Sequence, residues 1–137
     1  MVGDYARHRI EMSHVAGFQA CVLHDEVADV HANWVPGAGM LGASLVHQGD
    51  ELLWQGAGVD GYGHAREFMG IPFLHPWANR LDGYRYRAGD HDVVLDPASP
   101  LLLLDDHGLP IHGVLTASSR WLVLETAADT NRARLAA

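Results

Sequence analysis

Short hydrophobic runs, many of them alternating with polar residues, make up most of the chain, and few windows keep a helical spacing for three turns. Fifteen glycines and six prolines separate these runs, which favours short strands joined by turns. In residues 84–88, Tyr84 and Tyr86 share one face and the two arginines the other, as expected of a half-buried strand. The pattern predicts strands at residues 6–12, 18–24, 28–35, 42–47, 51–55, 84–88, 92–95, 101–104 and 120–126.

Two turns that contain glycine predict β-hairpins. Gln48-Gly49-Asp50 separates two apolar runs, and Ala88-Gly89-Asp90 separates an alternating run from an apolar one. Glycine supplies the positive φ that such turns require. The final stretch, 126–137, is small and polar, and we expect a short helix or a loop there.

A long segment between the hairpins, residues 56–82, shows little strand pattern. Loops of this length in a compact domain are usually functional or disordered. This one is too apolar for disorder, so we expect a structured loop packed on a β core. Its large apolar residues are Phe68, Ile71, Phe73, Leu74 and Trp77.

Length and composition narrow the class of protein. A chain of 137 residues without repeats or linkers predicts one domain over 1–137. The net charge of −8 disfavours a nucleic-acid partner. Cys21 stands alone, so no internal disulfide is possible. The N-terminus has no apolar signal region, and the run at 101–104 is too short to span a membrane. These features predict a soluble, cytoplasmic protein with no membrane partner.

Ten histidines raise the question of a metal site. None of them forms an HxH, HxxxH or HExxH arrangement, and no cysteine cluster accompanies them. We therefore expect scattered histidines and no metal. They are His8, His14, His24, His31, His47, His64, His75, His91, His107 and His112.

Two other common chemical signatures are weak or missing. The segment "GAGMLGAS" at 37–44 loosely resembles a dinucleotide-binding turn, but it leads into a predicted hairpin instead of a helix. We expect its glycines to serve turns and a bulge. No G-x-S-x-G elbow is present, and no sequence context activates Ser44, Ser118 or Ser119.

The stretch "GIPFLHPWANRL" at 70–81 places an amide and a guanidinium in an apolar loop. Asn79 offers two donors and an acceptor, and Arg80 offers a planar fork of donors. Both suit a ligand rich in hydroxyl groups. The two prolines stiffen the loop, and the Trp77 ring can lie under the apolar face of a sugar.

His112 interrupts the apolar stretch "LPIHGVL" and is a second polar candidate. A purely structural explanation stays open for both segments. In it, Arg80 pairs with a local aspartate such as Asp82, and His112 is a hydrogen-bonded core histidine. Spacing alone does not distinguish these alternatives.

Taken together, these segments resemble the aldose 1-epimerase (galactose mutarotase) family. The resemblance is carried by "GIPFLHPWANRL" at 70–81 and "LPIHG" at 109–113. The upstream stretch "VPGAGMLGASLVHQGDELL" at 35–53 also resembles the N-terminal region of that family. The resemblance extends over roughly residues 15–126.

The resemblance implies an all-β fold, a large antiparallel β-sandwich, of which this chain is the N-terminal part. Members of the family interconvert the α and β anomers of free aldohexoses such as galactose or glucose. Asn79 and Arg80 would belong to the sugar site. His112 would be the first of two active-site histidines, the one that holds and polarises the sugar. No cofactor is implied, because the reaction needs only proton transfer.

The same resemblance implies that the chain lacks part of the machinery. In the family the catalytic acid is a second histidine and the base is a glutamate, and both are expected beyond residue 137. We therefore expect the chain to be inactive alone. A partial sandwich leaves sheet edges exposed, so self-association is also expected.

Three alternatives remain open. A hexose-6-phosphate 1-epimerase would need extra cations, for which Arg85 and Arg87 are candidates. A non-catalytic carbohydrate-binding or regulatory module would keep Asn79, Arg80 and His112 without the acid and base. A cupin-like metal barrel is disfavoured by the histidine spacing.

Overall fold

The computed structural model describes residues 7–116 and 118–137, and nearly all of its regular structure is antiparallel β-strand. The chain divides into two compact units. The first holds the described residues up to Pro72 and those from Ser118 onward, and the second holds Phe73–Thr116. The predicted all-β, antiparallel fold is confirmed, whereas the single domain stays a prediction.

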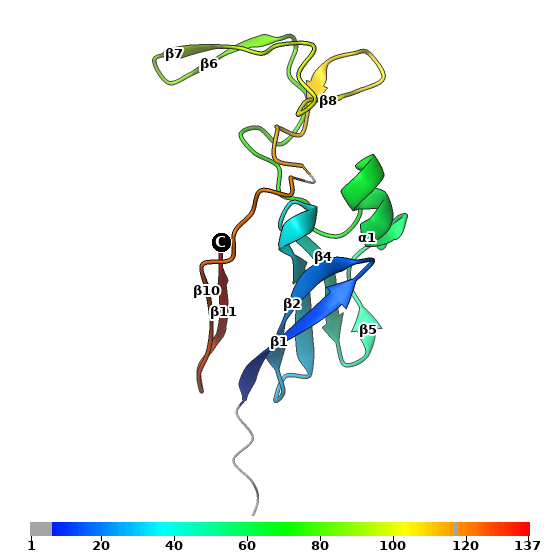
Figure 1. Cartoon of the computed structure of the whole chain (residues 1–137), viewed down its shortest axis with the longest axis vertical. Coiled ribbons are helices and arrows are strands. Elements are labelled where there is room, and N and C mark those ends of the chain that lie inside the picture. Colours follow the sequence, from blue (N-terminus) through cyan, green and yellow to red (C-terminus); the bar gives the residue numbers. More distant parts are fainter. Residues whose placement is uncertain (1–6, 117) are drawn as a thin grey trace, which may run out of the picture. The chain divides into compact units, whose positions relative to one another are not determined.

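The first unit is built on an antiparallel sheet whose five strands follow chain order (Figure 1). Every connection in this sheet joins neighbouring strands. A register shift between Asn33 and Trp34 marks an irregularity in the pairing of the third and fourth strands. The strands are β1 (His8–Val15), β2 (Phe18–Asp25), β3 (Val30–Val35), β4 (Leu41–His47) and β5 (Asp50–Glu51).

Most of these strands were predicted from short apolar or alternating runs. The ends of β2, β3 and β4 match the predicted ranges to within two residues. β1 runs on to Val15, past the predicted end at 12, and residue 6 of that prediction lies outside the described residues. The first predicted hairpin is confirmed, with Gln48 and Gly49 both left-handed. β5 is shorter than predicted.

The core of the first unit lies against one end of the sheet. It joins residues of β2, β3 and β4 to a short helical segment, α1 (Gly58–Asp60) followed by η2 (Gly61–Ala65). Tyr62 is fully buried and meets Phe68 edge-on, with ring centroids 6.2 Å apart. The long loop is therefore structured, as predicted, although its helical turn was not predicted. The buried cluster consists of Ala20, Val35, Ala38, Leu41, Ala43, Val59, Tyr62 and Met69, and Ala38 comes from the 3-10 turn η1 (Pro36–Ala38).

The C-terminal stretch differs from its prediction. It forms a hairpin, β10 (Glu125–Ala128) with β11 (Ala133–Ala136), where we expected a helix or loop, and the strand predicted at 120–126 begins only at Glu125. The turn explains the hairpin. The Asp129 carboxylate accepts hydrogen bonds from the N–H groups of Asn131 (2.7 Å) and Arg132 (3.1 Å), which closes the chain on itself.

The second unit contains two small hairpins. β6 (Arg85–Ala88) pairs with β7 (His91–Val94), which confirms the second predicted hairpin. β8 (Leu103–Leu104) pairs with β9 (Pro110–Ile111). The predicted strand at 101–104 is thus reduced to two residues. β9 was not predicted, because a two-residue strand that begins with proline carries no alternation.

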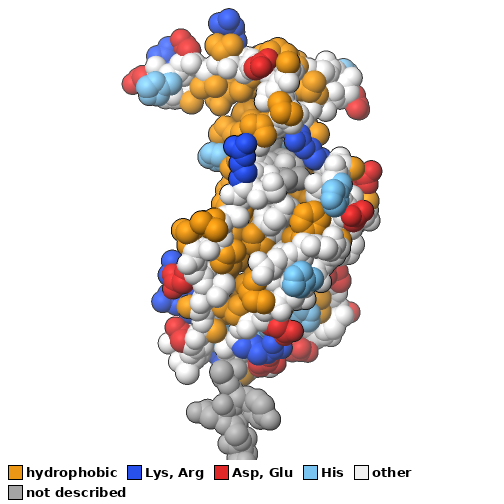
Figure 2. Space-filling view, viewed as in Figure 1, with side chains coloured by type: hydrophobic (Ala, Val, Ile, Leu, Met, Phe, Trp, Pro, Cys, Tyr) orange, Lys and Arg blue, Asp and Glu red, His pale blue; other side chains and the backbone are white. Residues whose placement is uncertain are grey.

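Many apolar side chains remain at the surface, as the space-filling view of one face shows (Figure 2). Just before β10, Leu122 and Leu124 are 71% and 72% exposed. Trp54 is 72% exposed. Scattered exposed residues are normal, but two exposed leucines two positions apart form a small apolar patch. None of the described helices is long and apolar enough to cross a membrane.

Candidate functional site

The predicted polar residues meet where two segments of the second unit run side by side. The N–H of Leu81 donates to the carbonyl of Pro110 (2.9 Å), and the N–H of His112 donates to the carbonyl of Asn79 (3.3 Å). The N–H of Val114 donates to the carbonyl of His75 (2.8 Å). We call these two segments, 75–81 and 110–114, the clasp. It brings "HPWANRL" against "PIHGV", although about thirty residues separate them in the chain.

The clasp depends on backbone that only some residues adopt. His112 and Gly113 both have positive φ, 63° and 76°. A side chain at 113 would collide with the backbone of His75, so only glycine fits this position. A left-handed histidine carries strain of roughly 1–3 kcal/mol. Such strain persists only where the surroundings impose it, and it is often found at functional sites.

The imidazole of His112 is oriented by the opposite strand of the clasp. Its Nδ1 lies 2.7 Å from the carbonyl oxygen of Ala78. A carbonyl only accepts, so Nδ1 must carry the proton. In the neutral ring, Nε2 is then the acceptor, and in the protonated ring it is a donor. Thr116 also donates to the carbonyl of His112 (2.9 Å), which steadies the turn that follows.

Asn79 and Arg80 are exposed, and their segment pairs with that of His112 through the backbone. The side-chain oxygen of Asn79 accepts a hydrogen bond from the N–H of Arg80 (2.8 Å). This bond fixes the amide, and the Asn79 NH₂ group supplies the donors of the pair. The two neighbours therefore present mainly donors, which suits the oxygen atoms of a hydroxyl-rich ligand.

The partner of Arg80 is Asp105, not the nearby Asp82 that sequence suggested. The Nε of Arg80 forms an ion pair with the Asp105 carboxylate, whose side chain is only 6% exposed. The N–H of Leu109, together with the N–H of His107 and the guanidinium of Arg80, holds the pKa of Asp105 below its ordinary value despite its burial. The carboxylate is therefore ionised at neutral pH.

Asp105 was not singled out from sequence. Two adjacent aspartates with a glycine two residues further on indicate a turn, but nothing in the sequence connects that turn to Arg80. Arg80 thus does pair with an aspartate, as the structural explanation expected, but the aspartate is Asp105 and not Asp82. This pairing does not exclude a binding role, because 48% of the Arg80 side chain stays exposed.

Trp77 lies in the same segment, and its ring packs on Tyr86 of β6. The ring centroids are 5.7 Å apart and the planes meet at 63°. Its indole nitrogen is buried and has no hydrogen-bond partner among the described residues. Packing on Tyr86 anchors the end of the clasp to the β6–β7 hairpin.

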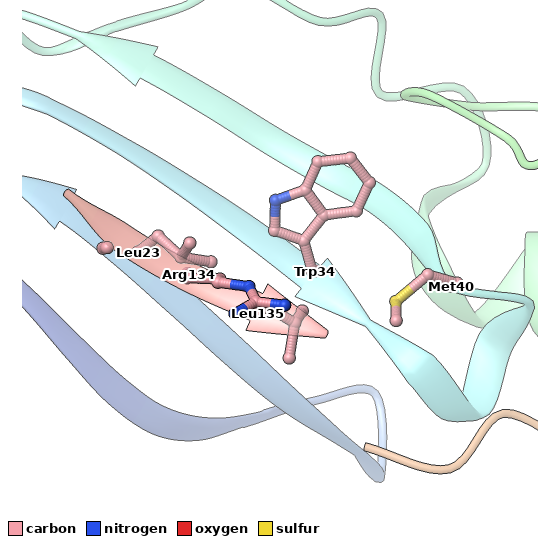
Figure 3. A pocket seen from close by; sticks show the side chains of 6 residues that line it. Leu23, Trp34, Met40, Arg134 and Leu135 are labelled. Carbon is pink, nitrogen blue, oxygen red and sulfur yellow. The ribbon is translucent and has the colours of Figure 1, made fainter. Parts of the chain in front are cut away.

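A large apolar cavity lies elsewhere, in the first unit. It measures about 370 Å³ and lies between the sheet and β11 (Figure 3). Arg134 is its only charged lining residue and pairs with Glu125 at 3.1 Å. A sugar needs several polar partners, so this apolar cavity is not the predicted site. Its other lining residues are Leu23, Trp34, Met40, Ala133 and Leu135.

Residues 7–116 and 118–137 contain no cluster of three or more His, Cys, Asp or Glu side chains that could hold a metal ion. The histidines that do meet, His24 and His31 on neighbouring strands, lie with ring centroids 5.6 Å apart. Desolvation and the nearby Arg9 lower the pKa of His24.

Comparison with solved structures finds the galactose 1-epimerase of Lactobacillus acidophilus NCFM, with a TM-score of 0.64. The match covers 96% of this chain at 16% identity, and it covers 37% of the epimerase chain. At that identity the similarity shows a shared fold alone: the all-β, galactose mutarotase-like fold. No family model and no curated protein matches the sequence.

Proposed function

Proceeding from this fold and from the clasp, we propose that the chain carries the sugar-binding wall of an aldose 1-epimerase, an isomerase of carbohydrate metabolism. The ligand would be a free aldohexose such as galactose or glucose. The observation that carries this proposal is the clasp itself. It gathers an amide, a guanidinium and an oriented imidazole, the three groups that the family resemblance assigns to the sugar.

The three groups have complementary roles in this proposal. Asn79 and Arg80 donate hydrogen bonds to hydroxyl or ring oxygens of the sugar. His112 presents Nε2 to the sugar, because Nδ1 is held by the carbonyl of Ala78. A protonated Nε2 donates to a sugar oxygen and polarises it, whereas a neutral Nε2 accepts from a hydroxyl. The rigid backbone of the clasp fixes these donors before the ligand arrives.

Anomer exchange requires two further proton-transfer groups. A base takes the proton from the anomeric hydroxyl while an acid protonates the ring oxygen as the C1–O5 bond breaks. Rotation about C1–C2 and closure on the other face of the carbonyl then reverse both transfers. No described residue is assigned to either role. The chain spans 37% of the length of the epimerase that it matches, and we propose that a complete site needs groups from outside this chain.

This proposal predicts binding without turnover. Addition of galactose to the purified chain is expected to shift the NMR signals of residues 77–81 and 109–114, with a dissociation constant in the millimolar range. Polarimetry of α-D-galactose should show the rate of the buffer blank. Methyl β-D-galactopyranoside, whose ring cannot open, should bind similarly, and glycerol should not bind. Absent shifts would refute the sugar site, and acceleration above the blank would refute the missing acid and base.

The phosphate alternative is less well supported by the site. Arg85 and Arg87 lie exposed on β6, and the latter donates to the carbonyl of Gly89 (3.1 Å) and lies 3.7 Å from Asp90. Local partners thus partly satisfy Arg87. Galactose 6-phosphate is therefore expected to bind the chain no more tightly than galactose in the same titration.

We also propose that the chain self-associates weakly through residues 121–124. Residues 121–124 lie outside the described strands, although the N–H of Leu124 donates to the carbonyl of Ala136 in β11 (2.9 Å). Leu122 and Leu124 are both exposed. An antiparallel pair of copies about a two-fold axis through Val123 would place Leu122 of each copy opposite Leu124 of the other. A four-residue contact is small, so the dimer should be weak.

Leu122→Lys tests this association, because a buried lysine on each copy would repel its counterpart. Sedimentation velocity at rising concentration should show dimer for the wild type and mainly monomer for the variant. Val27→Lys is the matched control, since Val27 is 74% exposed on the turn between β2 and β3. Equal association of all three proteins would exclude this segment as the contact.

A further inference from the structure

Asp105 is more deeply buried than an aspartate in a turn needs to be. Its Oδ1 accepts hydrogen bonds from the N–H groups of His107 (2.8 Å) and Leu109 (2.9 Å). The backbone closes the same turn, with Asp105 N–H donating to the carbonyl of Leu109 (2.9 Å). One side-chain oxygen therefore accepts both hydrogen bonds that the turn requires. The side-chain oxygen of a neutral asparagine could accept the same two bonds.

The negative charge has a different partner. The other carboxylate oxygen pairs with Nε of Arg80. Burial of an unpaired carboxylate is costly, whereas a paired one is tolerated. The ion pair with Arg80 therefore explains why this position is charged. The hydrogen bonds of the turn explain only why it carries a short side chain with an acceptor oxygen.

This carboxylate connects both sides of the clasp. The turn that it closes leads directly into β9, and His112 follows β9 in the chain. The backbone of Arg80 forms a bridge with Ile111 of β9. The same turn thus holds the Arg80 guanidinium through Asp105 and precedes the strand that leads to His112. The position of the guanidinium therefore constrains that of the imidazole.

We propose that Asp105 is the positioning residue of the sugar site. It holds Nε of Arg80, so that the remaining N–H donors of the guanidinium are directed to the ligand in register with His112. This inference rests on the proposed function, because it assigns a role within the same site. A guanidinium held at one nitrogen loses less conformational freedom when it binds, which favours affinity.

The test uses Asp105→Asn, which keeps the acceptor for the turn and removes the charge. We expect galactose affinity to fall at least fivefold while the amide NMR spectrum of the fold stays intact. Asp106→Asn, at the exposed neighbouring aspartate, is the matched control and should leave affinity unchanged. In the Arg80→Ala background, Asp105→Asn should cause no further loss of affinity, because its effect acts through Arg80.

A second measurement, of the Arg80 Nε–H resonance, tests the positioning role of Asp105 independently of sugar binding. The Arg80 Nε–H resonance should exchange slowly with water in the wild type and quickly in Asp105→Asn. An unchanged resonance, or equal losses of affinity with and without Arg80, would overturn the positioning role. If the wild type binds no galactose, the proposed function and the sugar role of Asp105 both fail. The Nε–H signal then still decides whether Asp105 holds the guanidinium.

Discussion

Gly113→Ala is expected to open the clasp and to destabilise the second unit by more than about 3 kcal/mol. Two effects add. Alanine is strained at a φ of 76°, and its Cβ would overlap the backbone oxygen, carbon and nitrogen of His75. Backbone cannot move aside as a flexible side chain can, so the hydrogen bond from Val114 to His75 should break. Amide hydrogen exchange of residues 75–81 and 110–114 measures the result, with β2 and β3 as internal references.

Gly108→Ala separates the two effects. Gly108 has a similar φ of 73°, but nothing lies within 4 Å of its Cβ position. Its substitution should cost only the conformational strain, about 1–2 kcal/mol. If both variants lose the same stability, the close approach to His75 is not what holds the clasp.

Arg80→Ala is expected to weaken galactose binding at least tenfold while the fold persists. The variant removes the principal donor of the proposed site. It also leaves the Asp105 carboxylate without its cationic partner, which lowers the stability of the unit. Asp105 keeps the N–H groups of His107 and Leu109, so this cost should not unfold the unit. In a longer epimerase that contains this segment, catalysis should fall far more than stability.

The double variant Arg80→Ala with Asp105→Asn provides the control. It removes the stranded charge and should recover most of the lost stability, measured by urea unfolding, without recovering galactose binding. An Arg80→Ala variant that unfolds yet binds galactose normally in its remaining folded fraction would show that Arg80 is structural only.

The strands of the main sheet illustrate what local pattern can predict. β2 and β4 carry short apolar runs, and apolar and polar residues alternate along β3, so the local pattern marks the positions of all three strands. Gly49 and Gly89 marked the two hairpin turns, because each adopts positive φ in a sequence of apolar runs. The C-terminal hairpin escaped prediction, since exposed strands of small polar residues carry no such alternation.

The candidate site was predictable only in part. Asn79, Arg80 and His112 were noticed because polar side chains in apolar segments are costly without a purpose. Asp105 was not, because its role is a contact across 25 positions of the chain that no local pattern records. The helical turn at 58–65 was missed for a related reason: its glycines disfavour a helix, and the burial of Val59 and Tyr62 supports it instead.

The sequence by itself determined the class of fold, the two glycine hairpins and the three polar residues that stand out in apolar surroundings. These properties are local, because each depends on the period of side chains along a strand or on the φ that a single residue allows. Tertiary structure alone decided which segments meet. The pairing of 75–81 with 110–114, the direction of the His112 imidazole and the ion pair of Arg80 with Asp105 all depend on the close approach of distant backbone, which only the folded chain provides.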